Sequence, residues 1–450
     1  MLIRFVITNF RSYGQETEFN MLPSQNVRRN DWHVYSDDTH SVPVLRAAVI
    51  YGANGAGKSC LIRAIGRLRA MVVHGILPPS ASRDTNRYTG AKEPVTLEIE
   101  FRTASGQYSY GVSYCGSTCV EEWLYSTKRT PKCIFERKRD RITGKTKISL
   151  LPTKKGNAKN NMLVSLLEEN ILKDNELLLS KYDVVKEVQM KDAYMWITTQ
   201  LHVIYPESHS TSIFDNRYSN PSFKRQSEKL IAALDLGIDG LVLKDEDLES
   251  FKLSISEWPE LVQGIENIVR KLSQTTDKDI EAMVEASSFT ISIRREGDKY
   301  FVRRVKSVHK VSAGNYDFEL KEESDGTQRI FDFLPIVHEV NDMTRTYVID
   351  ELDRSLHPSL VRALVERIVT DKNMKGQLIF TTHDAGLLNG NIFRNDEIWF
   401  AEKDHEMQNT HLYTLDEFKP RTDLNIEKGY LNGRFGAIPF LAKLNELDWE

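Results

Sequence analysis

The sequence predicts an α/β fold with an antiparallel β-subdomain and a helical insertion. A short apolar strand at 46–52 runs directly into a glycine-rich loop, and residues 59–76 then carry apolar side chains at helical spacing. Residues 94–138 form short runs separated by turn residues, which is typical of antiparallel strands. After residue 323, helices and buried strands alternate, as they do in a β/α layer.

The size and composition indicate an ordinary globular protein. The chain has 450 residues, of which 40% are hydrophobic and 28% charged, so two or three subdomains are expected. The net charge of −4 argues against a generally basic nucleic-acid coat. The apolar start MLIRFVITNF is short for a signal peptide and is interpreted as a strand. No apolar run approaches the ~20 residues of a membrane span. We therefore expect a cytoplasmic protein without a membrane partner.

Three segments are predicted. Residues 1–150 would form an N-terminal lobe with the glycine loop and the β-subdomain. Residues 151–290 have mostly helical spacing, too irregular for long coiled-coil arms, and would form a compact helical insertion. Residues 291–450 would return as strands, helix, strand, helix and strand to complete the C-terminal lobe.

Four cysteines are present: Cys60, Cys115, Cys119 and Cys133. The CGSTC pair has no His or Cys partner pair at zinc-finger spacing. Reduced thiols on hairpin strands are therefore a better interpretation than a metal site.

The segment GANGAGKS, from Gly52 to Ser59, fits the pattern G-x-x-x-x-G-K-[ST] completely. Glycines such as Gly55 and Gly57 let backbone N–H groups approach phosphate, and the following helix adds its positive N-terminal end. Lys58 would hold the β- and γ-phosphates, and Ser59 would ligate Mg²⁺. ATP and Mg²⁺ are the predicted cofactors.

The other half of such a site is predicted far along the chain. VIDELD places Asp350 and Glu351 at the end of an apolar strand, and Asp350 lies 292 residues after Lys58. Asp350 would help to hold Mg²⁺, and Glu351 would polarise the attacking water. The alternative is a solvated strand end without chemistry.

Two further motifs flank this strand. ESDGTQR contains Ser324 and Gly326 at the start of a helix, which could bind a γ-phosphate held by a second subunit. An ordinary helix cap is the alternative. TTHD ends the last buried strand, where His383 could contact the γ-phosphate or orient the water. A structural histidine is the alternative there.

Together these motifs resemble the ABC-type ATPases of the SMC/RecF/OLD group. They are more closely similar to the compact bacterial AAA-family ATPases of RloA, AbiL and PARIS (AriA)-type phage-defence systems. The resemblance rests on NFRSYG, YGANGAGKS, ESDGTQR, VIDELDRSLHP, QLIFTTHD and GYLNGRFGAIPF, and the middle of the chain carries almost none of it. It implies an ABC-type, SMC/RecF-like ATPase head.

The resemblance also implies roles for single residues. Arg11 would approach the nucleotide from the first hairpin, with a surface arginine as the alternative. Asn54 would contact the opposing subunit or the γ-phosphate, and Cys60 would join the nucleotide-binding residues. Asp353 would act across a dimer, with a solvated helix cap as the alternative. No glutamine matches the position expected near Mg²⁺, so that residue stays unassigned.

The implied function is an ATP-gated switch that forms homodimers or higher oligomers and hydrolyses ATP slowly. It would sense phage infection, with a phage protein as a candidate trigger, and control a toxic effector in trans. A Toprim-type nuclease is the expected effector, since the 67 residues after His383 are too few for a fused Toprim domain. A RecF/SMC-like DNA repair or maintenance ATPase is the main alternative. A transporter nucleotide-binding subunit and a pure binding scaffold fit less well.

Residues 128–147 contain nine Lys or Arg and two acidic residues. Contact with nucleic acid or an acidic partner is one interpretation, and a solvated basic hairpin is the other. Phe135 is the only aromatic residue in this stretch, unlike a single-strand stacking platform.

Overall fold

A computed structural model describes residues 1–438 except 28, 37–41, 89–92, 128–129, 151–157, 208–217, 256–258, 276–278, 287–288, 343, 389–391, 405 and 422–423. The chain divides into two units, which are described separately. The first comprises Met1–Pro206, Val340–Asp353 and Val365–Glu450, and the second Glu207–Glu339 and Arg354–Leu364. Helices α9 (Asp325–Asp342) and α10 (Pro358–Val369) each begin in the second unit and end in the first.

The nucleotide motifs lie at one end of a mostly parallel sheet in the first unit. Its six strands follow the order β11 (Leu201–Ile204), β17 (Thr346–Ile349), β18 (Gln377–Thr381), β5 (Ala47–Tyr51), β19 (Ile398–Lys403) and β20 (Thr410–Thr414). The first five are parallel, and β20 is antiparallel to β19. Every residue of β5, β17 and β18 is buried, as expected for strands covered on both faces.

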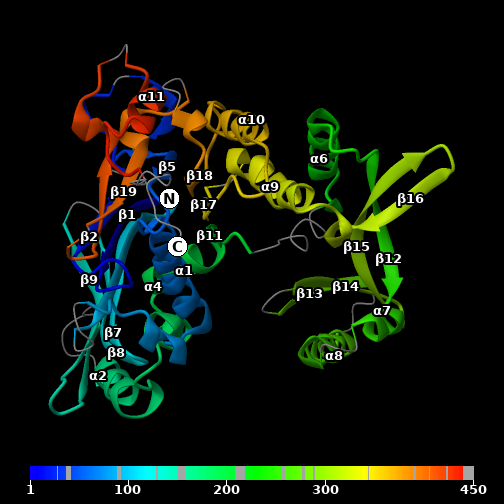
Figure 1. Ribbon diagram of the computed structural model, residues 1–450. Helices are drawn as coiled ribbons and strands as arrows, with labels where there is room; N and C mark the ends of the chain where they lie inside the picture. Colours follow the sequence, from blue (N-terminus) through cyan, green and yellow to red (C-terminus); the bar gives the residue numbers. More distant parts are fainter. Residues whose placement is uncertain are drawn as a thin grey trace, which may run out of the picture. The chain divides into compact units, whose positions relative to one another are not determined.

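An antiparallel sheet of seven strands forms the predicted β-subdomain (Figure 1). Its order is β10 (Thr146–Leu150), β9 (Lys132–Arg139), β8 (Thr118–Ser126), β7 (Gln107–Cys115), β6 (Val95–Arg102), β1 (Leu2–Thr8) and β2 (Thr17–Asn20). The short strands β3 (Val34–Tyr35) and β4 (Val44–Leu45) form a separate pair. The N-terminal hairpin and the strands expected within 94–138 are thus present.

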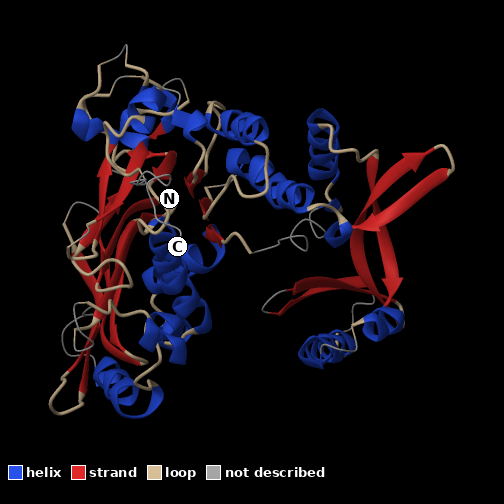
Figure 2. Ribbon diagram, viewed as in Figure 1, coloured by secondary structure: helices blue, strands red, loops and turns tan. Residues whose placement is uncertain are grey.

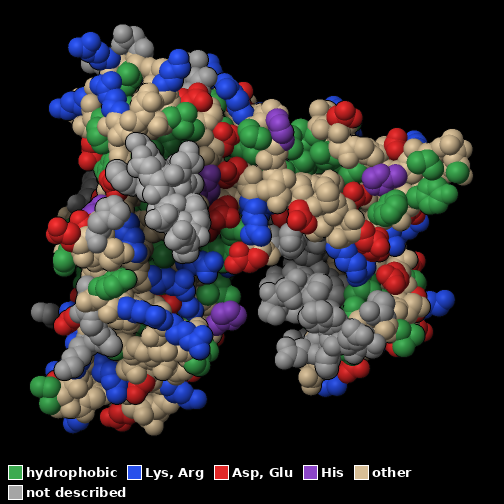
Figure 3. All heavy atoms as spheres, in the orientation of Figure 1, with side chains coloured by type: hydrophobic (Ala, Val, Ile, Leu, Met, Phe, Trp, Pro, Cys, Tyr) green, Lys and Arg blue, Asp and Glu red, His purple; other side chains and the backbone are tan. Residues whose placement is uncertain are grey.

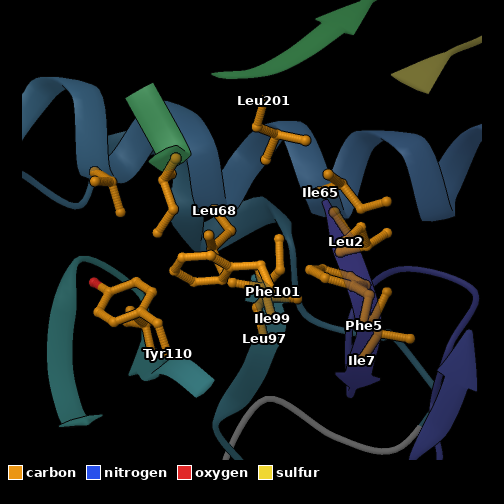
Figure 4. Packing of buried hydrophobic residues seen from close by; sticks show 14 of the residues in the cluster. Leu2, Phe5, Ile7, Ile65, Leu68, Leu97, Ile99, Phe101, Tyr110 and Leu201 are labelled. Carbon is orange, nitrogen blue, oxygen red and sulfur yellow. The ribbon is translucent and has the colours of Figure 1, made fainter. Parts of the chain in front are cut away.

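Helix α1 (Lys58–His74) ties the phosphate loop to the antiparallel sheet. Figure 4 shows Ile65 and Leu68 of this helix on the side that faces Leu2, Phe5 and Phe101 of the strands. All five side chains are fully buried. The burial of each such side chain contributes roughly 1.5–3 kcal/mol, so the start of α1 is held firmly. The shorter helices of this unit are α2 (Ala158–Leu166), α3 (Tyr182–Val185), α4 (Val188–Met195) and α11 (Ile426–Leu431).

The second unit combines helices with an antiparallel sheet (Figure 2). The strands run in the order β12 (Gly240–Asp247), β15 (Lys299–Val311), β14 (Phe289–Glu296) and β13 (Asp279–Ala286), and β16 (Gly314–Glu319) also pairs with β15. The helices are α6 (Pro221–Leu234), α7 (Leu248–Ser254) and α8 (Pro259–Ser273). Among the described residues of this unit, two small apolar cores form, one around Phe331 and Tyr218 and one around Phe251 and Ile293.

The predicted α/β class with an antiparallel subdomain is confirmed, but the insertion is not simply helical. Helices do occupy most of 158–200, yet these residues belong to the first unit. The second unit adds β12 and β13 to the strands that were expected after residue 289. The prediction of helix for the β12 segment was wrong because charged side chains pair across the strands there. Asp245, for example, accepts two hydrogen bonds from Arg303, and such pairs hide the alternating apolar pattern.

Candidate functional site: a phosphate loop facing two carboxylates

The glycine loop lies between β5 and α1, as the sequence predicts. Gly57 caps α1 with a φ of 106°, and a Cβ at this position would lie 2.2 Å from Oγ1 of Thr410. Any other residue would therefore be strained and would clash. Gly55 also has a positive φ of 78°, and both Asn54 and Gly55 are exposed, while Cys60 is half-buried. The loop thus presents its backbone next to a helix N-terminus, the arrangement that binds phosphate.

Lys58 folds back over this loop. Its Nζ donates hydrogen bonds to the carbonyl oxygens of Gly52 at 2.6 Å and Ala53 at 3.2 Å. Burial lowers the pKa of Lys58, and the carboxylates of Asp350 and Glu351 act in the opposite direction. The ammonium group is therefore held inside the loop beside negative charge, where it can exchange carbonyl partners for phosphate oxygens.

Asp350 forms hydrogen bonds with two motifs that are distant from each other in the sequence. The Ser59 hydroxyl donates to Oδ1 of Asp350 at 3.1 Å, and the Thr381 hydroxyl donates to the same oxygen at 2.7 Å. Asp350 is buried, with 1% of its surface exposed. A carboxylate oxygen beside a serine hydroxyl is a hard-oxygen donor set, which suits Mg²⁺. Thr381 was not predicted, because a threonine at the end of a buried strand looks like an ordinary β-branched core residue.

Glu351 follows in a left-handed conformation. Its φ is 47°, uncommon for a residue other than glycine, and such conformations cost roughly 1–3 kcal/mol. Its backbone N–H donates to the Thr381 hydroxyl at 2.8 Å. Thr381 therefore holds both carboxylate residues, Asp350 through its side chain and Glu351 through its backbone.

Asp353 and His383 are adjacent in the same unit. The backbone N–H of His383 donates to Oδ2 of Asp353 at 3.1 Å, and the His383 side chain is exposed. Oδ1 of Asp353 is buried and has no hydrogen-bond partner within the described part of the chain. Asp353 thus fixes the loop that carries His383, a contact that the sequence interpretation did not include.

The first hairpin and β20 together clamp the phosphate loop from outside. The Tyr13 hydroxyl donates to the Gly57 carbonyl at 3.1 Å, and the Thr410 hydroxyl lies 3.0 Å from the Ala56 carbonyl and 2.9 Å from the Ser12 hydroxyl. These clamp residues were also missed, since each contact joins segments that are remote in sequence. They show why the NFRSYG segment matters to the site.

Arg11 lies next to this clamp but faces an internal carboxylate. Its guanidinium is 3.8 Å from Asp84, which also pairs with Arg67 at 2.7 Å and accepts a hydrogen bond from Tyr114. Arg11 is about one-third exposed, and its Nε has no partner in the described structure. It is therefore neither a simple surface arginine nor shown to reach a nucleotide.

Ser324 and Gly326 belong to the second unit. The Thr327 backbone N–H donates to the Ser324 hydroxyl at 3.2 Å, so Ser324 does cap α9. A Cβ on Gly326 would lie 2.7 Å from the Ser355 carbonyl oxygen. The helix cap left open by the sequence is thus present, and a role of the same loop toward phosphate stays a prediction.

The remaining predictions concern the cysteines, the basic segment 128–147 and the membrane. All four cysteines are free thiols, and the described residues contain no cluster of three or more His, Cys, Asp or Glu side chains that could hold a metal ion. Within 128–147, Arg137 is buried and bonded to backbone carbonyls, and Arg139 pairs with Asp174. On the face in Figure 3, Lys and Arg side chains are interspersed with Asp and Glu. None of the described helices has the length and apolar character needed to cross a membrane.

The fold and the site define a P-loop ATPase: a mostly parallel sheet carries the phosphate loop after β5, and the carboxylates of Asp350 and Glu351 follow β17, with β18 between these two strands. A family profile described as "AAA domain, putative AbiEii toxin, Type IV TA system" matches residues 47–151 and 203–389, which is more than half of the chain. The chain belongs to this family. It is an AAA ATPase of the AbiEii type, a family whose members use a nucleotide together with a divalent metal.

Comparison with solved structures found SMC head domains. The SMC head domain from Thermotoga maritima is 11% identical, with 92% of this chain and 98% of that chain covered and a TM-score of 0.37. An SmcHead bound to the C-winged helix domain of ScpA is 12% identical, with 93% and 99% covered and a TM-score of 0.40. An Smc head with an extended coiled coil, from Pyrococcus furiosus, is 13% identical, with 93% and 99% covered and a TM-score of 0.33. No curated protein matches the chain.

Proposed function

We propose that this protein is an ATP-binding and ATP-hydrolysing switch in which two copies close around ATP and separate after hydrolysis. The observation that carries the proposal is the shared oxygen of Asp350, which accepts hydrogen bonds from Ser59 of the phosphate loop and Thr381 of β18. A chain whose phosphate loop and carboxylate strand are 292 residues apart brings them to hydrogen-bond distance. A strand end that only faced solvent would not need to lie within hydrogen-bond distance of the phosphate loop.

Each residue has a distinct task in the proposed reaction. The loop amides and Lys58 bind the phosphates, and Ser59 and Asp350 would hold Mg²⁺, which neutralises charge on the β- and γ-phosphates when bound. Glu351 accepts the proton of the attacking water, and the left-handed turn fixes where its carboxylate can point. His383 orients the water or the γ-phosphate, on a loop that Asp353 holds in place.

The second half of each site would come from another subunit. The phosphate loop already surrounds the nucleotide from one side, so Ser324, Gly326 and the N-terminus of α9 would act on ATP bound by the partner copy. That helix end carries the partial positive charge that a γ-phosphate favours. Arg11, Asn54, Cys60 and Asp353 are assigned supporting roles at the same composite site.

For the biological output, we propose that the switch controls a toxic effector during phage infection. The proposed effector is a Toprim-type nuclease, and the proposed trigger is a phage protein. The family description, which names an AbiEii toxin of a type IV toxin–antitoxin system, supports a defence setting over DNA maintenance. The basic segment 128–147 also favours a defence role over DNA maintenance. Arg137 and Arg139 are bonded to other groups within the fold, which reduces the positive charge available to nucleic acid.

Two variants test the enzyme part of the proposal. Glu351→Gln should retain ATP binding, lose about 100-fold or more in turnover, and accumulate ATP-bound dimers or larger assemblies in light-scattering chromatography. Lys58→Ala should lose both ATP binding and assembly. Glu406→Gln, at an exposed carboxylate, is the matched control. Wild-type turnover in Glu351→Gln would contradict the catalytic assignment.

The biological part needs a separate test. The gene and its neighbours, expressed in a susceptible host, should reduce phage plating, and Lys58→Ala should remove this protection. Strong stimulation of the ATPase by double-stranded DNA, without any effect on phage plating, would instead favour the DNA-maintenance alternative.

A further inference from the structure

A pocket with a volume of about 470 Å³ opens at the antiparallel edge of the parallel sheet. It lies away from the carboxylates of the ATP site, at the β19–β20 hairpin. Its lining consists of Glu402, Tyr413, Glu417, Phe418, Phe435 and Gly436. Two acidic and three aromatic residues in six form a chemically distinct site that no part of the ATPase reaction uses.

Within the described part of the chain, the two glutamates of the pocket have no ion-pair partner. Oε2 of Glu402 accepts a hydrogen bond from the Tyr413 hydroxyl at 2.9 Å, and Oε1 of Glu417 accepts one from the Thr414 backbone N–H at 2.8 Å. Among the described residues, no Lys or Arg forms an ion pair with either glutamate. Both carboxylates therefore favour a cationic ligand, and they would repel a phosphate.

The aromatic side suits a flat cation. The Phe418 side chain is 44% exposed, although its ring centroid lies 5.4 Å from that of Phe435 and 5.7 Å from that of Tyr413. Exposed aromatic faces beside carboxylates attract guanidinium groups, which stack on rings while their N–H groups bond to oxygen.

Gly436 keeps this corner open. A Cβ at this position would lie 2.6 Å from the Tyr413 hydroxyl oxygen and 2.9 Å from Oε2 of Glu402, and its φ of 67° also disfavours other residues. A side chain at position 436 would therefore displace the glutamate. The backbone thus preserves the carboxylate position.

Packed aromatic rings connect the pocket to the strand that precedes the phosphate loop. The Phe435 ring stacks on Phe400 with centroids 5.9 Å apart, and Phe400 lies 6.4 Å from Tyr51, the last residue of β5. A Cβ on Gly52 would lie only 2.5 Å from the carbonyl oxygen of Ala401, the neighbour of Glu402. A ligand that shifts Glu402 would press on the strand that supports the loop.

We propose that this pocket binds the guanidinium group of an arginine side chain presented by a partner protein. The guanidinium would stack on Phe418 and donate hydrogen bonds to Glu402 and Glu417. The volume exceeds that of a guanidinium alone, so the methylene stem of the arginine also fits. The site depends on its own geometry and does not require the proposed defence function.

Binding can be measured by calorimetry with the full chain and the blocked tripeptide acetyl-Ala-Arg-Ala-amide. The neutral control is the same peptide with citrulline, which keeps the shape and loses the charge. The arginine peptide should bind saturably, and the citrulline peptide at least fivefold more weakly. Free L-arginine should also bind more weakly, because its α-carboxylate meets the two glutamates.

Glu402→Gln should weaken peptide binding about five- to tenfold, and Phe418→Ala should weaken it about threefold or more. Glu406→Gln, an exposed carboxylate outside the pocket lining, should leave it unchanged. Unchanged melting temperatures confirm that each variant folds. Equal binding of both peptides, wild-type affinity in Glu402→Gln, tighter binding of free arginine, or no saturation by about 10 mM would each overturn the proposal.

Discussion

The Thr381 hydroxyl donates a hydrogen bond to Oδ1 of Asp350 at 2.7 Å, and it accepts one from the backbone N–H of Glu351 at 2.8 Å. One side chain on β18 thus positions both carboxylate residues at the end of β17. The two strands are parallel neighbours, so their carboxyl ends lie side by side. The geometry of the site depends on this pairing as much as on the phosphate loop.

Replacing Thr381 by valine keeps the shape and removes both hydrogen bonds. We expect a loss of about 1–3 kcal/mol in unfolding free energy, because the Glu351 N–H is left without its acceptor. ATP turnover should fall about tenfold or more, since both carboxylates lose their alignment. Denaturant titration and steady-state kinetics measure these effects. Thr381→Ser, which retains the hydroxyl, is the control, and a valine variant with wild-type kinetics would rule out this positioning role.

Lys58→Ala should weaken ATP binding about 100-fold or more, as measured with a fluorescent ATP analogue. Removing a buried ammonium whose pKa is lowered by burial should not destabilise the nucleotide-free protein greatly. Lys428→Ala, on the exposed face of α11, serves as the control. Retained ATP affinity in Lys58→Ala would mean that the loop is not the phosphate site.

The Ser324 loop has two possible roles that variants can separate. Ser324→Ala should cost about 1 kcal/mol of stability because the cap of α9 is lost. Ser324→Asp should preserve the cap, since Asp caps helices as well as Ser does, but it places a negative charge toward phosphate. We expect Ser324→Asp to fold normally and to lose most ATPase activity. Wild-type activity in this variant would leave Ser324 with the capping role alone.

The pair of Asp245 and Arg303 predicts a pH dependence. Hydrogen bonds from Arg303 and its charge lower the pKa of Asp245. A lowered pKa of a carboxyl group means that its stabilisation is present above its usual value of 3.8 and is lost as the pH falls through the folded-state pKa. Asp245→Asn should therefore cost roughly 1 kcal/mol at pH 7 and less at pH 2. Equal destabilisation at both pH values would show that the loss is one of packing.

The sequence predicted those parts of the site whose chemistry is local. Gly57 and Lys58 belong to one short pattern, and Asp350 and Glu351 follow a short apolar run, so each is recognisable without the fold. Thr381, Tyr13 and Thr410 could not be found in this way. Their roles arise from contacts between segments remote in sequence, and a threonine or tyrosine in a strand or hairpin has an ordinary structural explanation.

The same distinction between local patterns and contacts of remote segments applies to the fold. The antiparallel strands within 94–138 alternate clearly and end at turn residues, so they were predictable. Strand β12 was not, because Asp245 and its neighbours satisfy their charges across the sheet. The border at Pro206 was also missed, because the helices before it pack on the core of the first unit, which only the tertiary structure reveals.

The central claim, that each ATP site is shared between two copies, is tested most directly by mixing two inactive variants. Lys58→Ala lacks a working phosphate loop, and Ser324→Asp lacks a working Ser324 loop. A mixed dimer has one site in which both parts are intact, so an equal mixture should recover about a quarter of the wild-type ATPase activity. If the mixture stays as inactive as its components although Ser324→Asp alone is folded and binds ATP, the sites are not shared between subunits.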